Sequence, residues 1–213
     1  MSASTAAEPP DVIGFFGGSF DPIHLGHIQL ARELRERAGL RTLLLCPAHQ
    51  APLRDQPHHA SPEHRLAMVK AAVGNLPGLE VDDREIRAAG PNYTRDTLRQ
   101  IRRERPGENL ILVLGSDQLA KLPRWRHVND LVAENEFLVL ARPDHPVQAP
   151  AALPDLRFRS FPTQKFEHSS TQVRKLIRSR QPYEHLLPEP VADYVKRHRL
   201  YPEREQTTPP AAT

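Results

Sequence analysis

Short apolar runs alternate along the chain with segments in which apolar residues recur every three or four positions. The short runs have the length of buried strands, and several stop at glycine or proline. Six of them predict strands, at residues 12–16, 42–46, 79–86, 110–114, 137–141 and 157–161. Four of the six are apolar almost throughout, which is typical of strands buried on both faces of a parallel sheet.

The intervening segments show the helical period of apolar residues. In the first, Ile28 and Leu34 share one face, and Gly39 follows as a predicted C-cap. The second begins favourably, because Ser61 suits an N-cap and Pro62 the first helical position. Its inward face is predicted to carry Leu66, Val69 and Val73. Helices are expected at residues 27–38, from 62 onward, and at 94–105, 128–133, 170–179 and 191–198.

This alternation predicts an α/β fold: a Rossmann-like, doubly wound, mainly parallel sheet with helices on both faces. The 213 residues suffice for one domain with a substantial core, expected at residues 11–202. Residues 1–10 and 203–213, rich in small residues and proline, are expected to be disordered tails. Ligands of such sheets bind at the carboxyl ends of the strands, so the chemistry is expected at the strand-to-helix turns.

Composition narrows the classes of function. Hydrophobic residues make up 38% of the chain and charged residues 26%, an ordinary balance for a globular protein. The net charge is +3, without a basic cluster interleaved with aromatic residues, which disfavours a nucleic-acid partner. No apolar stretch has the length of a membrane helix, and residues 1–10 show no feature of a secretory signal. Cys46 is the single cysteine, so no intrachain disulfide can form, and we expect a cytoplasmic protein.

The turn after the first strand carries the strongest chemical signal. It reads GGSFDPIHLGH and leads from the first predicted strand into the first predicted helix. Gly17 and Gly18 permit backbone conformations and close approaches that a side chain forbids. Backbone N–H groups at a helix start favour phosphate oxygens, and His24 and His27 lie near one face there. Two imidazoles aimed at a phosphate can donate hydrogen bonds to its developing negative charge.

Other interpretations of this turn stay open at this point. A Gly-Gly turn after a strand is often only a turn, and two histidines at this spacing can form half of a metal site. A second pair of ligands is not evident, because the next histidines along the chain are scattered and expected at the surface: His49, His58, His59 and His64. The segment is neither a Walker A motif nor the dinucleotide-binding pattern G-x-G-x-x-G.

Two later segments offer matching chemistry. The segment HSSTQVRKLI places Ser170 and Thr171 at a helix N-terminus with Arg174 one turn on, which suits an anion. Asp117 follows the fourth strand, where it could accept hydrogen bonds from a ribose, and Trp125 lies in a loop suited to stacking. The plainer alternatives are ordinary helix caps at the first two places and a core position for the tryptophan.

The string GGSFDPIHLGH resembles the signature of the adenylyltransferase branch of the HxGH nucleotidyltransferases. The resemblance implies that His24 and His27 contact the phosphates of ATP and act in catalysis. It implies further ATP contacts at Gly17, Gly18, Ser19, Phe20 and Asp117. The segment HSSTQVRKLI is similar to the second signature of that family. The similarity implies that the β- and γ-phosphates are held by Ser170, Thr171 and Arg174.

Two further segments, GSDQLAKLPRW and NYTRDTL, resemble the nicotinate-mononucleotide branch of that family. By this resemblance, Trp125 stacks on the pyridine ring. Tyr93 and Thr94 then belong to a loop whose backbone N–H groups receive the nicotinate carboxylate. Thr94 would also suit an ordinary helix N-cap. Arg142, after the fifth strand, is a further expected contact of the mononucleotide.

One segment departs from the family pattern. Residues 46–54 read CPAHQAPLR, whereas the family usually has Pro-Pro-His followed by lysine or arginine at the end of this stretch. Ala51 and Leu53 stand here at the first proline and the histidine, while the second proline and Arg54 remain. Arg54 is expected to reach a phosphate and is assigned to the mononucleotide. His49 is a candidate to replace the missing histidine.

The resemblance implies transfer of the adenylyl group of ATP to nicotinate mononucleotide, yielding deamido-NAD and pyrophosphate. The partners are then these two nucleotides, with Mg²⁺ accompanying ATP and no metal-ligating residues of the protein itself. Three alternatives stay open: nicotinamide mononucleotide or another phosphate acceptor, a non-catalytic nucleotide-binding module, and a zinc protein using the two histidines. The preference for acid or amide and the oligomeric state are open too, and a homo-oligomer is compatible with the sequence.

Overall fold

The computed structural model describes residues 12–50, 53, 56–88, 90–141, 146–163 and 168–202. They build one six-stranded sheet whose strands are all parallel, in the order β3-β2-β1-β4-β5-β6. The predicted doubly wound α/β fold is therefore confirmed. The predicted tails and two predicted site residues, Arg54 and Arg142, lie outside the described residues.

The strands carry side chains into two separate cores. In β2, Leu43 and Leu45 face one core, whereas Leu44 and Cys46 face the other. Both faces of the central strands are therefore apolar, which explains why they read as continuous apolar runs. The strands are β1 (Val12–Gly18), β2 (Thr42–Pro47), β3 (Leu79–Val81), β4 (Asn109–Gly115), β5 (Glu136–Ala141) and β6 (Phe158–Pro162).

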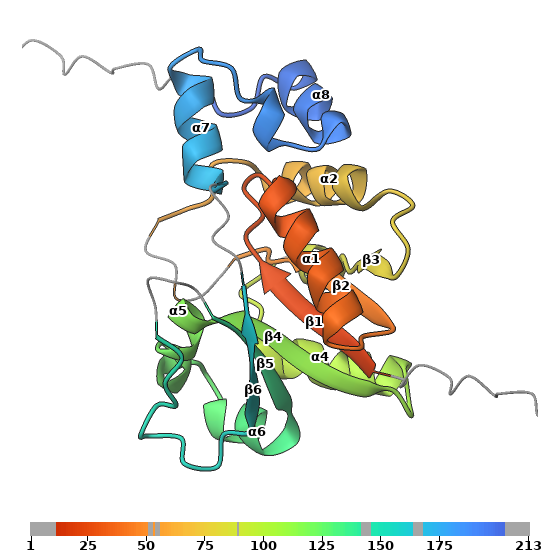
Figure 1. The fold of residues 1–213 in the computed structure, drawn as a ribbon, viewed down its shortest axis with the longest axis vertical. Helices are drawn as coiled ribbons and strands as arrows, with labels where there is room; N and C mark the ends of the chain where they lie inside the picture. Colours follow the sequence, from red (N-terminus) through yellow and green to blue (C-terminus); the bar gives the residue numbers. More distant parts are fainter. Residues whose placement is uncertain are drawn as a thin grey trace, which may run out of the picture.

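Two layers of helices cover the sheet. The first core packs against α1 (Leu25–Arg37), α2 (Pro62–Val73), α7 (Ser170–Arg178) and α8 (Glu189–Arg197). The second core packs against α4 (Thr94–Glu104), α5 (Ser116–Leu119) and α6 (Val128–Glu134). Short turns of helix complete the chain: α3 (Arg84–Arg87), η1 (Leu122–Arg124) and η2 (Glu184–Leu186). Figure 1 shows α2, α7 and α8 gathered at one end of the molecule. Within the described ranges, no helix combines the length and apolarity that crossing a membrane requires.

The third strand is shorter than predicted. It ends at Val81 rather than reaching residue 86, and α3 begins three residues later. The Asp82 carboxylate accepts hydrogen bonds from the backbone N–H of Arg84 at 3.0 Å and from its Nε at 2.8 Å. An aspartate that bonds the backbone two residues on turns the chain out of a strand. The prediction of a strand over 79–86 is wrong because it weighed apolar content and ignored this turn.

Two predicted helix-end signals agree with the structure, whereas α1 and α8 each begin two residues before their predicted starts at 27 and 191. Ser61 caps α2 by accepting a hydrogen bond from His64 N at 3.3 Å. The C-cap of α1 is Ala38, and Gly39 directly after it has a φ of +69°, a conformation that glycine adopts without strain. Local sequence signals therefore mark these two boundaries.

The strand order reverses between β1 and β4. β1 pairs with β2 on one side and with β4 on the other. The connections that leave these two strands run in opposite directions, which opens a crevice at their carboxyl ends. Gly18 ends β1 and Gly115 ends β4 at this place.

Candidate active site

The turn between β1 and α1 is held by α7. Arg174 Nη1 donates to the backbone oxygen of Asp21 at 2.6 Å, and the Ser170 hydroxyl donates to that of Pro22 at 2.9 Å. Figure 1 shows the first turn of α7 beside the start of α1. The two segments that carried the strongest sequence signals, far apart in the chain, therefore meet in one place.

A buried arginine of α2 holds the same turn from another helix. Arg65 is fully buried, and it donates from Nη1 to Ser19 O at 2.9 Å and from Nη2 to His49 O at 3.0 Å. It thereby joins the first turn to the segment that follows β2. The inward face of α2 is shifted from the predicted one, because Arg65 is buried and Leu66 is only half-buried.

The Asp21 carboxylate ties a third segment to the turn. It is 1% exposed and accepts hydrogen bonds from the backbone N–H groups of His59 at 2.8 Å and Ala60 at 3.1 Å. In the same segment, His58 Nε2 lies 3.2 Å from Ser19 Oγ. His58 is predicted to lie at the surface, but it is half-buried and contacts the turn. His59 is exposed as predicted.

The glycines at the end of β1 serve close packing. Neither Gly17 nor Gly18 has a positive φ, and the left-handed residue of the turn is Phe20, with a φ of +46°. A Cβ on Gly18 would lie 2.8 Å from the Phe20 ring. Gly18 therefore leaves room for the Phe20 ring, and neither glycine uses the unusual φ that glycine permits. The Phe20 ring is buried, so any contact with a nucleotide would use its backbone.

The two histidines of the turn stack on each other at the start of α1. The ring centroids of His24 and His27 lie 3.7 Å apart, with 29° between the planes. His24 is the N-cap, and its backbone N–H donates to His27 Nδ1 at 3.3 Å. A ring nitrogen that accepts a hydrogen bond carries no proton, so the neutral His27 ring holds its proton on Nε2. The Phe20 ring packs edge-on against His27 with centroids 5.2 Å apart and supports it.

The first turn of α7 combines a cap with contacts to the β1–α1 turn. Ser169 is the N-cap, and its hydroxyl accepts from Gln172 N at 3.1 Å. Arg174 Nη2 donates to the Thr171 hydroxyl at 3.2 Å, so one guanidinium holds both its own helix and the turn. The ordinary serine cap considered for this segment is therefore confirmed, at Ser169.

Two loops predicted to bind the mononucleotide, those of Tyr93 and Trp125, meet beside the second core. Tyr93 is the N-cap of α4 and makes no side-chain capping hydrogen bond, so Thr94 is the first helical residue rather than the cap. The Arg126 guanidinium lies 4.8 Å from the centre of the Tyr93 ring, and its Nη1 donates to the Tyr93 hydroxyl at 3.0 Å. Because Arg126 follows Trp125 directly, the loops of Tyr93 and Trp125 lie together.

Trp125 and Asp117 make local contacts in the structure. Trp125 is half-buried and packs against the second core, so part of its surface serves the fold. Asp117 is the second residue of α5, and its Oδ2 accepts from Gln118 Nε2 at 2.8 Å. The N-cap of α5 is Gly115, so the alternative of Asp117 as a cap is wrong. Contacts of Trp125 and Asp117 with nucleotides stay predictions.

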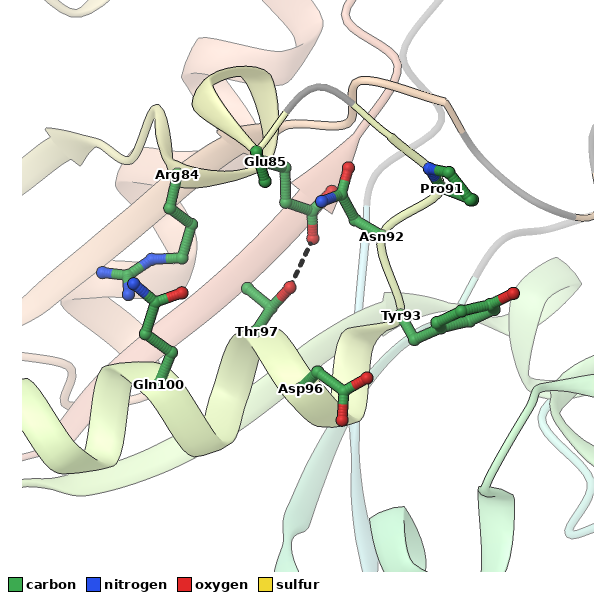
Figure 2. Close-up of a pocket in the computed structure, with 9 residues that line it drawn as sticks. Arg84, Glu85, Pro91, Asn92, Tyr93, Asp96, Thr97 and Gln100 are labelled. Carbon is green, nitrogen blue, oxygen red and sulfur yellow. Dashed lines mark hydrogen bonds between the residues drawn. The ribbon is translucent and has the colours of Figure 1, made fainter.

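A small cavity lies behind the Tyr93 loop, with a volume of about 200 Å³ (Figure 2). Glu85 lines it, is 7% exposed, and accepts a hydrogen bond from the Thr97 hydroxyl at 2.9 Å. Burial raises the pKa of Glu85 from its ordinary value of 4.5 to about 7. The hydrogen bond from Thr97 acts against this rise in pKa, while the negative charge of Asp82 adds to it.

Comparison with known proteins places this geometry in a family. The Cytidylyltransferase-like family model matches residues 15–176. A protein of Opitutus terrae named "probable nicotinate-nucleotide adenylyltransferase" is 38% identical over 189 residues, covering 89% of this chain and 97% of that protein. A protein of the same name from Roseiflexus sp. is 39% identical over 195 residues, with the same two shares. The chain belongs to the nicotinate-nucleotide adenylyltransferase family.

A solved structure has the same fold as this chain. It is the Plasmodium falciparum nicotinic acid mononucleotide adenylyltransferase complexed with NaAD. The TM-score is 0.74 at 20% sequence identity, and the match covers 89% of this chain and 96% of that chain. The two relatives confirm the family that the sequence resembles, and the solved structure confirms the fold.

The sequence predicted the residues of the β1–α1 turn but not the residues that hold this turn in place. Arg65 carried a usable signal, because it stands three and four residues before Met68 and Val69 on the apolar face of α2. Asp21 stood inside the recognised string without a role. His58 gave no local signal, because its contact with the turn depends on the path of the loop before α2.

Replacing Arg65 should loosen the turn. Arg65→Met leaves the backbone oxygens of Ser19 and His49 without their donor, so we expect a loss of about 1–3 kcal/mol in the free energy of unfolding. We expect kcat/KM to fall roughly 10- to 100-fold, because small misplacements of reacting groups are costly. Urea denaturation and steady-state kinetics measure the two effects.

Two variants control this prediction. Arg65→Lys keeps the charge but cannot donate to two carbonyls in a planar fork, so its loss should be intermediate. Arg32→Met removes an exposed arginine from α1 and should change neither quantity. Wild-type kcat/KM in Arg65→Met would show that the guanidinium is not needed to place the turn.

Glu85 should make the stability of the fold depend on pH. The unfolded chain releases this proton near 4.5 and the folded chain near 7, so only the folded state holds it between those values. The contribution of protonated Glu85 to the free energy of unfolding is complete below pH 4.5. It is lost as pH rises through 7, which lowers the free energy of unfolding by about 3 kcal/mol. Urea denaturation between pH 5 and 8 should show the wild type losing stability relative to Glu85→Gln. Parallel curves would contradict this assignment.

Proposed function

We propose that this chain transfers the adenylyl group of ATP to nicotinate mononucleotide, giving deamido-NAD and pyrophosphate. The observation that carries the proposal is the contact of α7 with the turn of the two histidines, through Arg174 to Asp21 O and Ser170 to Pro22 O. It brings two groups of phosphate-binding chemistry to one strand end. The names of the relatives from Opitutus terrae and Roseiflexus sp. support the choice of substrates.

The reaction needs positioned donors rather than a protein nucleophile. A phosphate oxygen of the mononucleotide attacks the α-phosphorus of ATP, and the bond from that phosphorus to the bridging oxygen breaks as pyrophosphate leaves. The attacking oxygen is already anionic, so no strong base is required. Catalysis then rests on orientation and on stabilising charge that develops at the phosphates.

We assign the phosphate donors to the histidine pair and α7. The Nε2–H of His27 is set as a donor, because Nδ1 is taken by the backbone of His24. His24 and His27 would stabilise the α-phosphate and the leaving group. Thr171 and Arg174 would hold the pyrophosphate, with Ser170 beside them. Gly17, Gly18, Ser19 and the backbone of Phe20 would place the nucleotide, and Asp117 would contact it at the end of β4.

The acceptor is assigned to the loops of Tyr93 and Trp125. An aromatic N-cap leaves the first N–H groups of α4 without a side-chain cap, and a helix N-terminus favours a negative charge. This supports the nicotinate carboxylate over the neutral amide at the Tyr93–Thr94 loop. Trp125 would stack on the pyridine ring. The proposed contacts of Arg54 and Arg142 rest on the family resemblance.

The donor set of the site suits phosphates better than a metal ion. Imidazole, hydroxyl and guanidinium groups predominate at the turn, and the Asp21 carboxylate already accepts two backbone N–H groups. In the part of the chain that the structure describes, no three His, Cys, Asp or Glu side chains are arranged to hold a metal. We therefore propose that Mg²⁺ enters as part of the substrate, bound by ATP phosphates and water. Bound there, it would neutralise charge on the phosphate oxygens.

A pyrophosphate-release assay tests the function. ATP and Mg²⁺ are supplied with nicotinate mononucleotide, nicotinamide mononucleotide or phosphopantetheine. We expect the nicotinate substrate to give the highest kcat/KM. A higher value with another acceptor would favour that acceptor, and ATP binding without any release would favour a non-catalytic module. Zinc that stays bound after purification would favour the metal-binding alternative.

His27→Ala should impair the chemical step. Loss of one positioned donor typically costs about 100- to 1000-fold in kcat, and we expect a fall of that order with little change in KM. His27→Gln, whose amide can donate from a similar position, should lose less. The exposed His185 provides a matched control, since His185→Ala should leave kcat unchanged. Near-normal turnover in His27→Ala, with the circular dichroism spectrum unchanged, would refute the assignment.

A further inference from the structure

Polar contacts tie α4 and the loop before it to α3. The Thr97 hydroxyl donates to Glu85 Oε1 at 2.9 Å, and both side chains are buried, at 5% and 7% exposure. With its nitrogen facing them, the Asn92 side chain donates to Gly90 O at 2.8 Å and Glu85 O at 3.2 Å. Figure 2 shows Glu85, Asn92 and Thr97 converging, while the Tyr93 ring is directed away from them.

The position of Thr97 in α4 explains how this contact can affect the loop before the helix. Thr97 lies three residues after Thr94 in α4, so the two side chains share one face of the first turn. A hydrogen bond at Thr97 therefore fixes both the rotation of that turn and the direction of its leading N–H groups. Those N–H groups belong to the loop assigned to the acceptor, so α3 reaches the acceptor site through one buried contact.

Burying a carboxyl group is costly. An apolar side chain in the same place would avoid the desolvation of a titratable group. The carboxyl oxygen, however, supplies an acceptor that no apolar side chain can offer to Thr97, and a buried donor left without a partner is itself costly. The pair therefore gives this place one defined geometry.

We propose that Glu85 and Thr97 are positioning residues for the acceptor mononucleotide, acting through the 90–94 loop rather than touching the substrate. The inference rests on the proposed function, because it assigns that loop to nicotinate mononucleotide. It separates the two substrates, because the segments assigned to ATP, which are the β1–α1 turn, α7 and Asp117 of α5, do not include this contact. Loss of the contact weakens the binding of the acceptor mononucleotide and leaves the binding of ATP unchanged.

The test is a split between two Michaelis constants. Thr97→Val removes the donor while keeping the shape, and we expect KM for nicotinate mononucleotide to rise about tenfold with KM for ATP unchanged within about twofold. Thr97→Ser restores the hydroxyl and Glu85→Gln keeps an acceptor oxygen, so both should stay near wild type. Glu85→Met breaks the same contact from α3 and should reproduce the effect, which covers the case in which Thr97→Val does not fold.

Two further measurements sharpen the outcome. The double variant Glu85→Met/Thr97→Val should be no worse for the acceptor than the worse single variant, because both remove one interaction. Thr42→Val is the matched control: Thr42 is 5% exposed at the start of β2, at the opposite end of the strands, and its loss should move neither KM. Equal rises in both KM values, or an unchanged acceptor KM in Thr97→Val and Glu85→Met, would overturn the inference alone. A wild-type protein that releases no pyrophosphate with nicotinate mononucleotide would overturn the proposed function and this inference with it.

Discussion

Two guanidinium groups that donate to backbone oxygens hold the site together. Arg65 reaches Ser19 O from α2, and Arg174 reaches Asp21 O from α7. The carbonyl groups of an irregular turn have no regular partners, so these donors satisfy them and fix the path of the chain at once. The stacked histidines inherit their position from that path. The arginines also add positive charge near the starts of α1 and α7, where each helix dipole contributes a partial positive charge as well.

Most of the fold could be predicted from the sequence, because the signals for strands and helix ends are local. The apolar runs gave all six strands, and Ser61 and Gly39 marked their helix ends, since caps and buried runs depend on neighbouring residues. The strand predicted over 79–86 failed because a single aspartate, Asp82, turned the chain. Apolar content could not report a hydrogen bond from a side chain to the backbone.

The motif residues of the site could be predicted from the sequence, whereas the residues that hold them in place could not. His24, His27, Ser170 and Arg174 stood in recognisable strings, and the structure brings their segments together. The partners that hold them come from α2 and from the loop before it, at distances along the chain that no local pattern spans. Glu85 likewise attracts notice only once Thr97 faces it across the turn between two helices.

The sheet separates the two halves of the proposed site. The turn of the histidines, α2 and α7 pack on one core, whereas α4 and the loop of Trp125 pack on the other. Each half can therefore change its packing while the strands between them keep their place. Under the proposed assignment, an exchange of acceptor would alter mainly the layer of α4 and the Trp125 loop. The histidine turn and α7 would be retained on the opposite face, and Asp117 of α5 is the proposed ATP contact that lies on the acceptor's side.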